Sequence, residues 1–152
     1  EYQHMGTTLV CAVARSDMAI IGNIGDSRAY HITPEGIFQI SRDHSVVENM
    51  VAKGDLTPLE ARTHPNRNLI TRALGPDIHA KADTFELPWH KDEFLLLCSD
   101  GLVNTVSDQE MLFEVLHDGD VNECLDHLLQ ISLQRGAPDN ITAVLLLNEE
   151  GR

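Results

Sequence analysis

Short apolar segments bounded by turn residues constrain the fold of this chain more than any other feature of its sequence. Residues 94–98 are apolar at every position and are bounded by Asp92 and Ser99, which is typical of a strand buried on both faces. Further segments predict strands over residues 8–14, 18–25, 29–32, 37–40 and 141–147. Residues 33–36, which include Pro34 and Gly36, predict a hairpin loop between two of these strands.

Two helical regions interrupt the strands. Capping boxes predict four helix starts, at Ser45 and Glu48, Thr57 and Glu60, Ser107 and Glu110, and Asp120 and Glu123. Residues 62–77 are polar and predict an exposed lobe. The resulting order of strands and helices lacks the regular alternation of a parallel sheet, and so predicts an α+β fold with antiparallel sheets.

Composition narrows the class of partner. The chain has 152 residues, of which 42% are hydrophobic, and a net charge of −13. This size fits one globular domain, and the acidic balance argues against nucleic-acid and membrane surfaces. We expect neither a signal peptide nor a membrane span. The three cysteines, Cys11, Cys98 and Cys124, are sparse and unpatterned, which predicts buried thiols in a reducing cytoplasm.

Three aspartates share one position relative to the predicted strands. Asp26 and Asp100 each follow an apolar strand, and Asp139 precedes one. Carboxylates gathered at the end of a buried sheet repel each other unless a cation lies between them. Oxygen ligands favour a hard ion such as Mg²⁺ or Mn²⁺, and no His or Cys pattern supports zinc. The alternative interpretation is that each Asp serves only as a turn or cap residue.

The triplet Gly25-Asp26-Ser27 permits a different hypothesis, in which Ser27 is the nucleophile of a GDSL-type esterase. Such a nucleophile needs a base to accept its proton. No Asp in this chain has a His three residues later, and Arg28 stands where the esterase motif has Leu. The sequence therefore disfavours an esterase.

The same residues carry a family resemblance. The motifs are MGTT at residues 5–8, GDSR at 25–28, DHS at 43–45, TPLEARTHPNRNLITRALG at 57–75, SDGL at 99–102 and DNIT at 139–142. In this order and spacing, the chain resembles the PPM-type (type 2C) metal-dependent Ser/Thr protein phosphatases, in particular the bacterial ones. The resemblance spans nearly the whole chain.

The resemblance implies a four-layer αββα sandwich with antiparallel sheets, incomplete at its N-terminal side. It implies that Asp100 and Asp139 hold a metal of a binuclear centre, whereas Asp26 and Asn68 contact a third. Residues 44–76 would form a flap that influences substrate access. Ser27 and Arg28 would be structural neighbours, and the histidines of the flap would be surface groups.

Part of the family pattern is not found in residues 1–152, which predicts a partial catalytic domain. The D-G-x-G segment and the Arg that binds the substrate phosphate are expected upstream of this chain. In the complete domain, the resemblance implies hydrolysis of phosphoserine and phosphothreonine in proteins by a metal-activated water, with two or three Mn²⁺ or Mg²⁺ ions. Its partners would be phosphorylated proteins, opposing a Ser/Thr kinase in the cytoplasm.

Two alternatives to an enzyme remain at this stage. One is a catalytically silent PPM-like module that binds phosphoproteins or another partner, and the other is an acidic structural domain. We also expect the chain by itself to be impaired as an enzyme. Because its sheets would lose edge strands, we expect it to self-associate.

Overall fold

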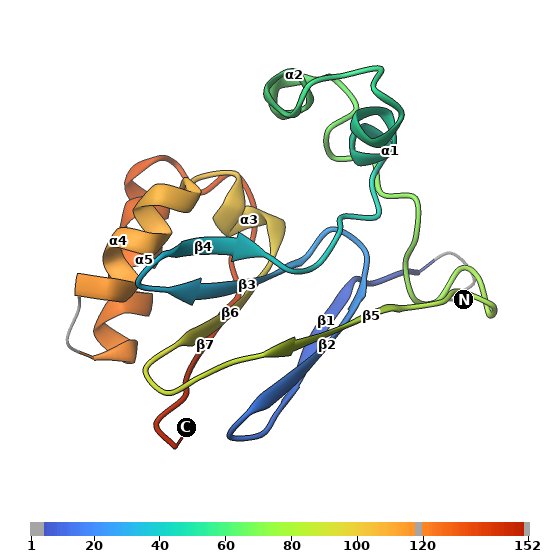
Figure 1. Cartoon of the computed structure of the whole chain (residues 1–152). Helices are drawn as coiled ribbons and strands as arrows, with labels where there is room; N and C mark the ends of the chain where they lie inside the picture. The colour runs from blue at the N-terminus through green and yellow to red at the C-terminus, as the bar shows by residue number, and fades with distance from the viewer. Residues whose placement is uncertain (1–4, 118–119, 151–152) are drawn as a thin grey trace.

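Two antiparallel sheets form the centre of the computed structural model, which describes residues 5–117 and 120–150 (Figure 1). The three-stranded sheet has the order β1-β2-β5, with β1 at Leu9–Ala14, β2 at Met18–Ile24 and β5 at Asp83–Pro88. The four-stranded sheet has the order β4-β3-β6-β7, with β4 at Gly36–Gln39, β3 at Arg28–Thr33, β6 at Phe94–Cys98 and β7 at Ala143–Leu147. Every strand pair is antiparallel, which confirms the predicted α+β class.

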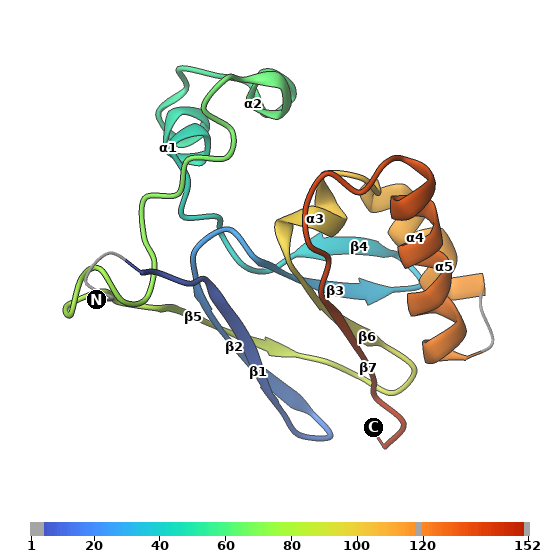
Figure 2. The same ribbon diagram turned by 180° about the vertical axis from the view of Figure 1, so that it is seen from behind.

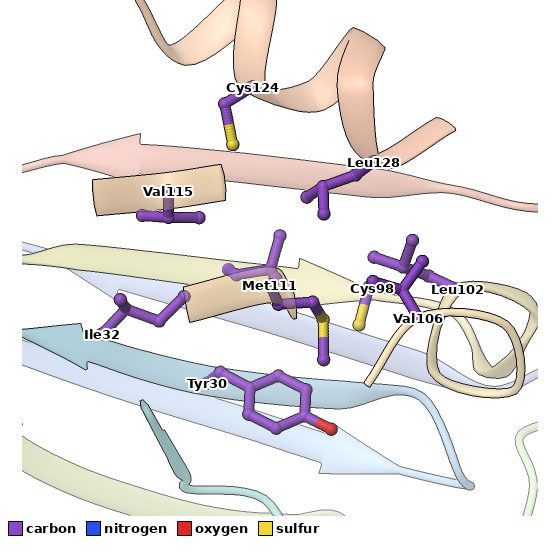
Figure 3. Packing of buried hydrophobic residues seen from close by; sticks show 10 residues of the cluster. Tyr30, Ile32, Cys98, Leu102, Val106, Met111, Val115, Cys124 and Leu128 are labelled. Carbon is purple, nitrogen blue, oxygen red and sulfur yellow. The ribbon is translucent and has the colours of Figure 1, made fainter. Parts of the chain in front are cut away.

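Helices cover one face of the four-stranded sheet (Figures 1 and 2). They are the short α3 at Asp100–Val103, α4 at Asp108–His117 and α5 at Val121–Gln134. In Figure 3, Met111, Val115 and Leu128 extend from α4 and α5 toward the strands that carry Tyr30, Ile32 and Cys98. No helix formed by the described residues is long and apolar enough to cross a membrane.

A second core joins the two sheets. Ile21 of β2 and Leu95 of β6 are fully buried in it together with Ala29, and Trp89 closes one end. The molecule is therefore layered as helices, sheet and sheet. Within residues 5–117 and 120–150, no helix covers the outer face of the three-stranded sheet, so three layers of the predicted αββα sandwich are present (Figure 1).

Residues 44–71 form a lobe that projects from the sheets and carries two short helices (Figures 1 and 2). These are α1 at Val46–Lys53 and α2 at Pro58–Thr63. The two chain segments at its base are joined where the Val46 amide donates to Leu69, at 2.9 Å, and the Thr71 amide donates to His44, at 2.7 Å. The lobe falls within the predicted flap segment, residues 44–76.

The structure corrects the sequence predictions in several places. Strand β5 and helix α3 were not predicted, and β7 begins at Ala143 rather than at residue 141, because Thr142 exchanges hydrogen bonds with Ser99 instead. The Ser45 box is half formed: the Ser45 hydroxyl accepts from the Glu48 amide, but the Glu48 carboxylate faces Arg42, at 3.6 Å.

The thiol prediction is correct for two of the three cysteines. Cys98 and Cys124 are buried, whereas Cys11 is exposed on β1. None of the three is in a disulfide. Cys11 is exposed because alternate residues of β1 face away from the second sheet, where no described helix lies.

Candidate metal centre

Strand register brings the three predicted aspartates to one edge of the four-stranded sheet. The first residue of β3 pairs with the last residue of β6, which pairs in turn with the first residue of β7. Asp26 shortly precedes β3, Asp100 shortly follows β6, and Asp139 shortly precedes β7. The antiparallel order thus places three loops from distant parts of the chain side by side.

Asp26 lies in a tight turn that β1 supports from one side. Gly25 has a φ of +106°, and a Cβ at this position would collide with Thr8. The Ser27 and Thr8 hydroxyl groups are hydrogen-bonded, at 2.9 Å. Because Ser27 is only 8% exposed and has this structural partner, the turn does not present it as an esterase nucleophile.

Asp100 and Asp139 are held by contacts between their own loops. The Ser99 amide donates to Thr142, at 2.9 Å, and the Thr142 amide donates to the Ser99 hydroxyl, at 3.0 Å. Gly101 lies so close to the Asn140 carbonyl that a Cβ would overlap it. The SDGL and DNIT motifs are therefore two halves of one packed unit.

Burial and mutual repulsion both act on the carboxylates. Partial burial raises the pKa of Asp26, and the charge of Asp100 raises it further. Partial burial likewise raises the pKa of Asp100, with a second contribution from the charge of Asp139. Asp100 is thus electrostatically coupled to both of the other aspartates. A cation beside Asp100 would offset both the burial and the repulsion.

The aspartates are of the ligand type that a hard divalent cation prefers, but they supply too few oxygen atoms to complete its coordination. Carboxylate oxygens are the ligands that Mg²⁺ and Mn²⁺ prefer, and a six-coordinate ion needs more of them than two aspartates supply. Among the described residues, no group of three or more His, Cys, Asp or Glu side chains is arranged to hold a metal ion. Asp100 and Asp139 therefore supply only part of the coordination that such an ion needs.

All four residues predicted to bind metal line one cleft. Asp26, Asp100 and Asp139 line it on the side of the sheet, and Asn68 lines it on the side of the lobe. The cleft has a volume of about 840 Å³, which is large enough for a peptide side chain and its neighbours. Whether any of the four binds a metal stays a prediction at this point.

Arg28 also lines the cleft, and three of the five N–H groups of its guanidinium group already have partners. Its Nε donates to Asp43 Oδ1, at 2.9 Å, its Nη2 donates to Asp43 Oδ2, at 2.7 Å, and its Nη1 donates to the Tyr30 hydroxyl, at 3.0 Å. The bidentate contact fixes the orientation of the guanidinium group, and the Asp43 charge neutralises it. This geometry agrees with the structural role predicted for Arg28.

His44 was predicted to be a surface group, and this prediction is wrong. The side chain is only 6% exposed and contacts the Gly25 turn on one side and Asp83 of β5 on the other. Asp83 was missed together with its strand. A signal for His44 existed in the sequence, because it follows Asp43 inside the DHS motif rather than lying in the polar part of the lobe.

The chain matches a known protein family and is similar in sequence to known phosphatases. A family model described as Protein phosphatase 2C matches residues 1–145. The serine/threonine phosphatase stp of Listeria monocytogenes is 36% identical over 151 residues, which is 97% of this chain and 60% of that protein.

Solved structures are similar in fold as well as in sequence. Serine/threonine phosphatase Stp1 from Staphylococcus aureus is 42% identical, with a TM-score of 0.92, over 97% of this chain and 58% of that one. The catalytic domain of the phosphatase PstP in complex with two manganese ions is 34% identical, with a TM-score of 0.83, over 94% of this chain and 59% of that one. The chain spans about 60% of the length of each of these three relatives.

Proposed function

Because this chain belongs to the protein phosphatase 2C family of bacterial PPM-type Ser/Thr phosphatases, we propose that the complete protein hydrolyses phosphoserine and phosphothreonine in proteins. The family assignment confirms the resemblance found in the sequence motifs. The substrates would be phosphorylated proteins, and the enzyme would oppose a Ser/Thr kinase. A manganese-bound relative of similar fold supports Mn²⁺ or Mg²⁺ as the cofactor.

Within this proposal, Asp100 and Asp139 hold one ion of a binuclear centre. Asp100 begins α3 and Asp139 lies in the loop before β7, and contacts between the adjacent residues fix the backbone that carries both of them. Asp26 and Asn68, on opposite walls of the cleft, contact a third and weaker ion. When bound, such ions lower the pKa of a water molecule and offset the charge of the phosphoryl group.

Other residues of the cleft set its charge and form the wall that faces the aspartates. Asp43, Asp108 and Glu110 add to the acidic lining, which would repel a phosphate in the absence of cations. Arg28 neutralises Asp43 and so reduces that repulsion. The lobe, which forms the facing wall, would act as the flap and contact the substrate peptide beyond its phosphorylated residue.

The convergence of Asp26, Asp100 and Asp139 at one sheet edge is the observation that carries the proposal. A phosphatase is favoured over a catalytically silent module because the acidic residues are partly buried and repel each other, which a bound cation would offset. A binding module for phosphoproteins would gain nothing from concentrated negative charge at the point where the phosphate must lie.

The test is release of phosphate from a phosphothreonine peptide by the complete protein, with and without Mn²⁺. Asp100→Asn and Asp139→Asn should each lower the rate and the Mn²⁺ affinity by at least about 10–100-fold, which is the cost of losing groups that merely support ligands. Asp17→Asn is the matched control, because Asp17 is an exposed residue of the β1–β2 turn. Full activity in the Asp100 variant, or in excess chelator, would overturn the proposal.

For residues 1–152 alone we propose much weaker activity. Two aspartates do not complete the coordination of a hard cation, and the chain covers about 60% of its relatives. Activity close to that of the complete protein would contradict this. Cys98 and Cys124 are buried and neither is in a disulfide, which supports the further proposal that this part of the protein works in a reducing compartment, the cytoplasm.

A further inference from the structure

His44 makes hydrogen bonds from both ring nitrogens and from both of its backbone groups. The Gly25 amide donates to His44 Nδ1, at 3.0 Å, and His44 Nε2 lies 2.8 Å from Asp83 Oδ2. The His44 amide donates to the Gly25 carbonyl, at 2.8 Å, and the His44 carbonyl accepts from Thr71. This one residue therefore joins the turn that carries Asp26, strand β5 and the base of the lobe.

These contacts fix the protonation state of the imidazole. A backbone N–H can only donate, so His44 Nδ1 must be the acceptor and cannot carry a proton. Nε2 then carries the single ring proton and donates it to Asp83. A protonated His44 would point Nδ1–H at the Gly25 N–H, and the contact would be lost. Asp83 thus selects the tautomer that Gly25 needs.

The Gly25 N–H depends on this contact, because the other supports of the turn act on different groups. Thr8 packs against Gly25 and bonds Ser27, and Asn23 Nδ2 reaches the Gly25 carbonyl only at 3.4 Å. The Gly25 N–H, which belongs to the Ile24–Gly25 peptide, is held by His44 Nδ1, and the carbonyl of the Gly25–Asp26 peptide is held by the His44 amide. Without the first contact the Ile24–Gly25 peptide could rotate, and such a rotation would shift Asp26 relative to the sheet edge.

The contact also ties the turn to the lobe. Arg72, just after the returning segment of the lobe, donates to Asp83 Oδ1, at 2.8 Å, while His44 bonds the other oxygen of the same carboxylate. Both ends of the lobe are therefore anchored to one aspartate of β5. A shift of the base of the lobe would therefore move His44 and, through its hydrogen bonds, Gly25.

We propose that His44 is a positioning residue for Asp26: as the neutral Nε2–H tautomer set by Asp83, it holds the Gly25 peptide and links it to the base of the lobe. This inference concerns the proposed metal-binding role of Asp26 and therefore rests on the proposed function. His44 does not line the cleft, so the role proposed for it is to position Asp26 and not to contact the substrate.

The test uses two substitutions in the complete protein that separate the functions of the two nitrogens. His44→Asn keeps an acceptor near the Nδ1 position but cannot reach Asp83. His44→Gln keeps a donor that reaches Asp83 but leaves the Gly25 amide without its acceptor. His79→Asn and His79→Gln are the matched controls, because His79 is exposed.

Three readouts are measured: the ¹⁵N chemical shifts of the His44 ring, hydrogen exchange of the Gly25 amide, and Mn²⁺ affinity by calorimetry. We expect an unprotonated Nδ1 in the wild type. Gly25 exchange should become about fivefold faster, the effect of one lost hydrogen bond, in His44→Gln but not in His44→Asn. The weakest Mn²⁺-binding step should weaken by about 10–100-fold in the same variant, and kcat should fall with KM little changed.

A protonated Nδ1 in the wild type would overturn the proposal, and so would a Gln variant that keeps slow Gly25 exchange and normal Mn²⁺ binding. Equal loss in both variants would also overturn it, because that pattern indicates general unfolding rather than positioning. The ring shifts and the Gly25 exchange do not depend on catalysis. A protein without Mn²⁺-dependent phosphate release would therefore refute the proposed function while these readouts still decide the role of His44.

Discussion

Asp83 accepts hydrogen bonds from two side chains at the base of the lobe, and its effect on stability should depend on pH. The bond from His44 lowers the pKa of Asp83; partial burial opposes this shift and the bond from Arg72 adds to it. Since the folded-state pKa lies below the unfolded value of about 3.9, the stabilisation is present above that value and is lost as the pH falls through the folded-state pKa. Asp83→Asn should therefore destabilise the protein at pH 7 and have progressively less effect below about pH 4.

Urea unfolding of the wild type and the variant between pH 3 and pH 8 measures this difference. Asp17→Asn, which removes an exposed carboxylate of the β1–β2 turn, serves as the control and should shift stability little at any pH. A gap between wild type and Asp83→Asn that is as large at pH 3 as at pH 7 would show that the carboxylate charge is not the cause.

At the scale of residues, the sequence predicted the aspartates well and the groups that support them poorly. The positions of Asp26, Asp100 and Asp139 follow from strand ends, which apolar patterning locates. The contact between His44 and Asp83 does not, because its partners are 39 residues apart and meet only once β5 has paired with β2. A buried His in a polar stretch carries no local sign of its partner.

Among the secondary-structure elements, those with a clear apolar run or a capping signal were predicted, whereas β5 and α3 were not. Strand β6 is buried along most of its length and its pattern is unambiguous. Strand β5 lies at a sheet edge and buries only alternate residues, and α3 has only four residues. Such elements form because neighbouring strands and loops are already in place, which a local pattern does not record.

Helix α2 should depend on its N-terminal cap, because none of its residues is buried. The Thr57 hydroxyl accepts from the Glu60 amide and the Glu60 carboxylate accepts from the Thr57 amide, which completes the box. Thr57→Ala should weaken the helix by about 1 kcal/mol, with too little packing to compensate. Amide exchange within α2 should then accelerate about fivefold without a change in global stability.

Thr63→Ala is a matched control at the other end of α2, because the Thr63 hydroxyl makes only a long contact with the Glu60 carbonyl, at 3.4 Å. Its exchange rates should stay close to those of the wild type. If the two substitutions had equal effects, the cap would not be what maintains this helix. If neither substitution changed the exchange rates, helix α2 would have to be stabilised by packing of the lobe against the rest of the protein.

At the scale of the whole molecule, the layers are unevenly covered. The four-stranded sheet is buried between helices and the second sheet, so its core is closed on both sides. The three-stranded sheet is closed on one side only among the described residues (Figure 2). The family resemblance predicted this incomplete sandwich, whereas composition and periodicity predicted only the antiparallel α+β class.

The open face should make residues 1–152 self-associate when produced alone. Val13 and Leu9 of β1 are 66% and 48% exposed there, and Ile20 and Met18 of β2 are 41% and 40% exposed. Cross-strand pairing of Val13 with Ile20 makes the patch continuous, and such a patch favours burial against another apolar surface. The net charge of −13 opposes association, so added salt should strengthen it by screening the repulsion.

Sedimentation velocity over a range of concentrations and salt tests this expectation. Val13→Lys together with Ile20→Lys should shift the chain toward monomer, because each places a charge in the centre of the patch. Leu59→Lys together with Leu69→Lys, at two exposed positions of the lobe, adds the same charge outside the patch and should leave association unchanged. A wild-type chain that stays monomeric at high salt would contradict the expectation. If the control variant dissociated equally, the loss of association would be due to net charge rather than to this face, since both variants are less acidic than the wild type.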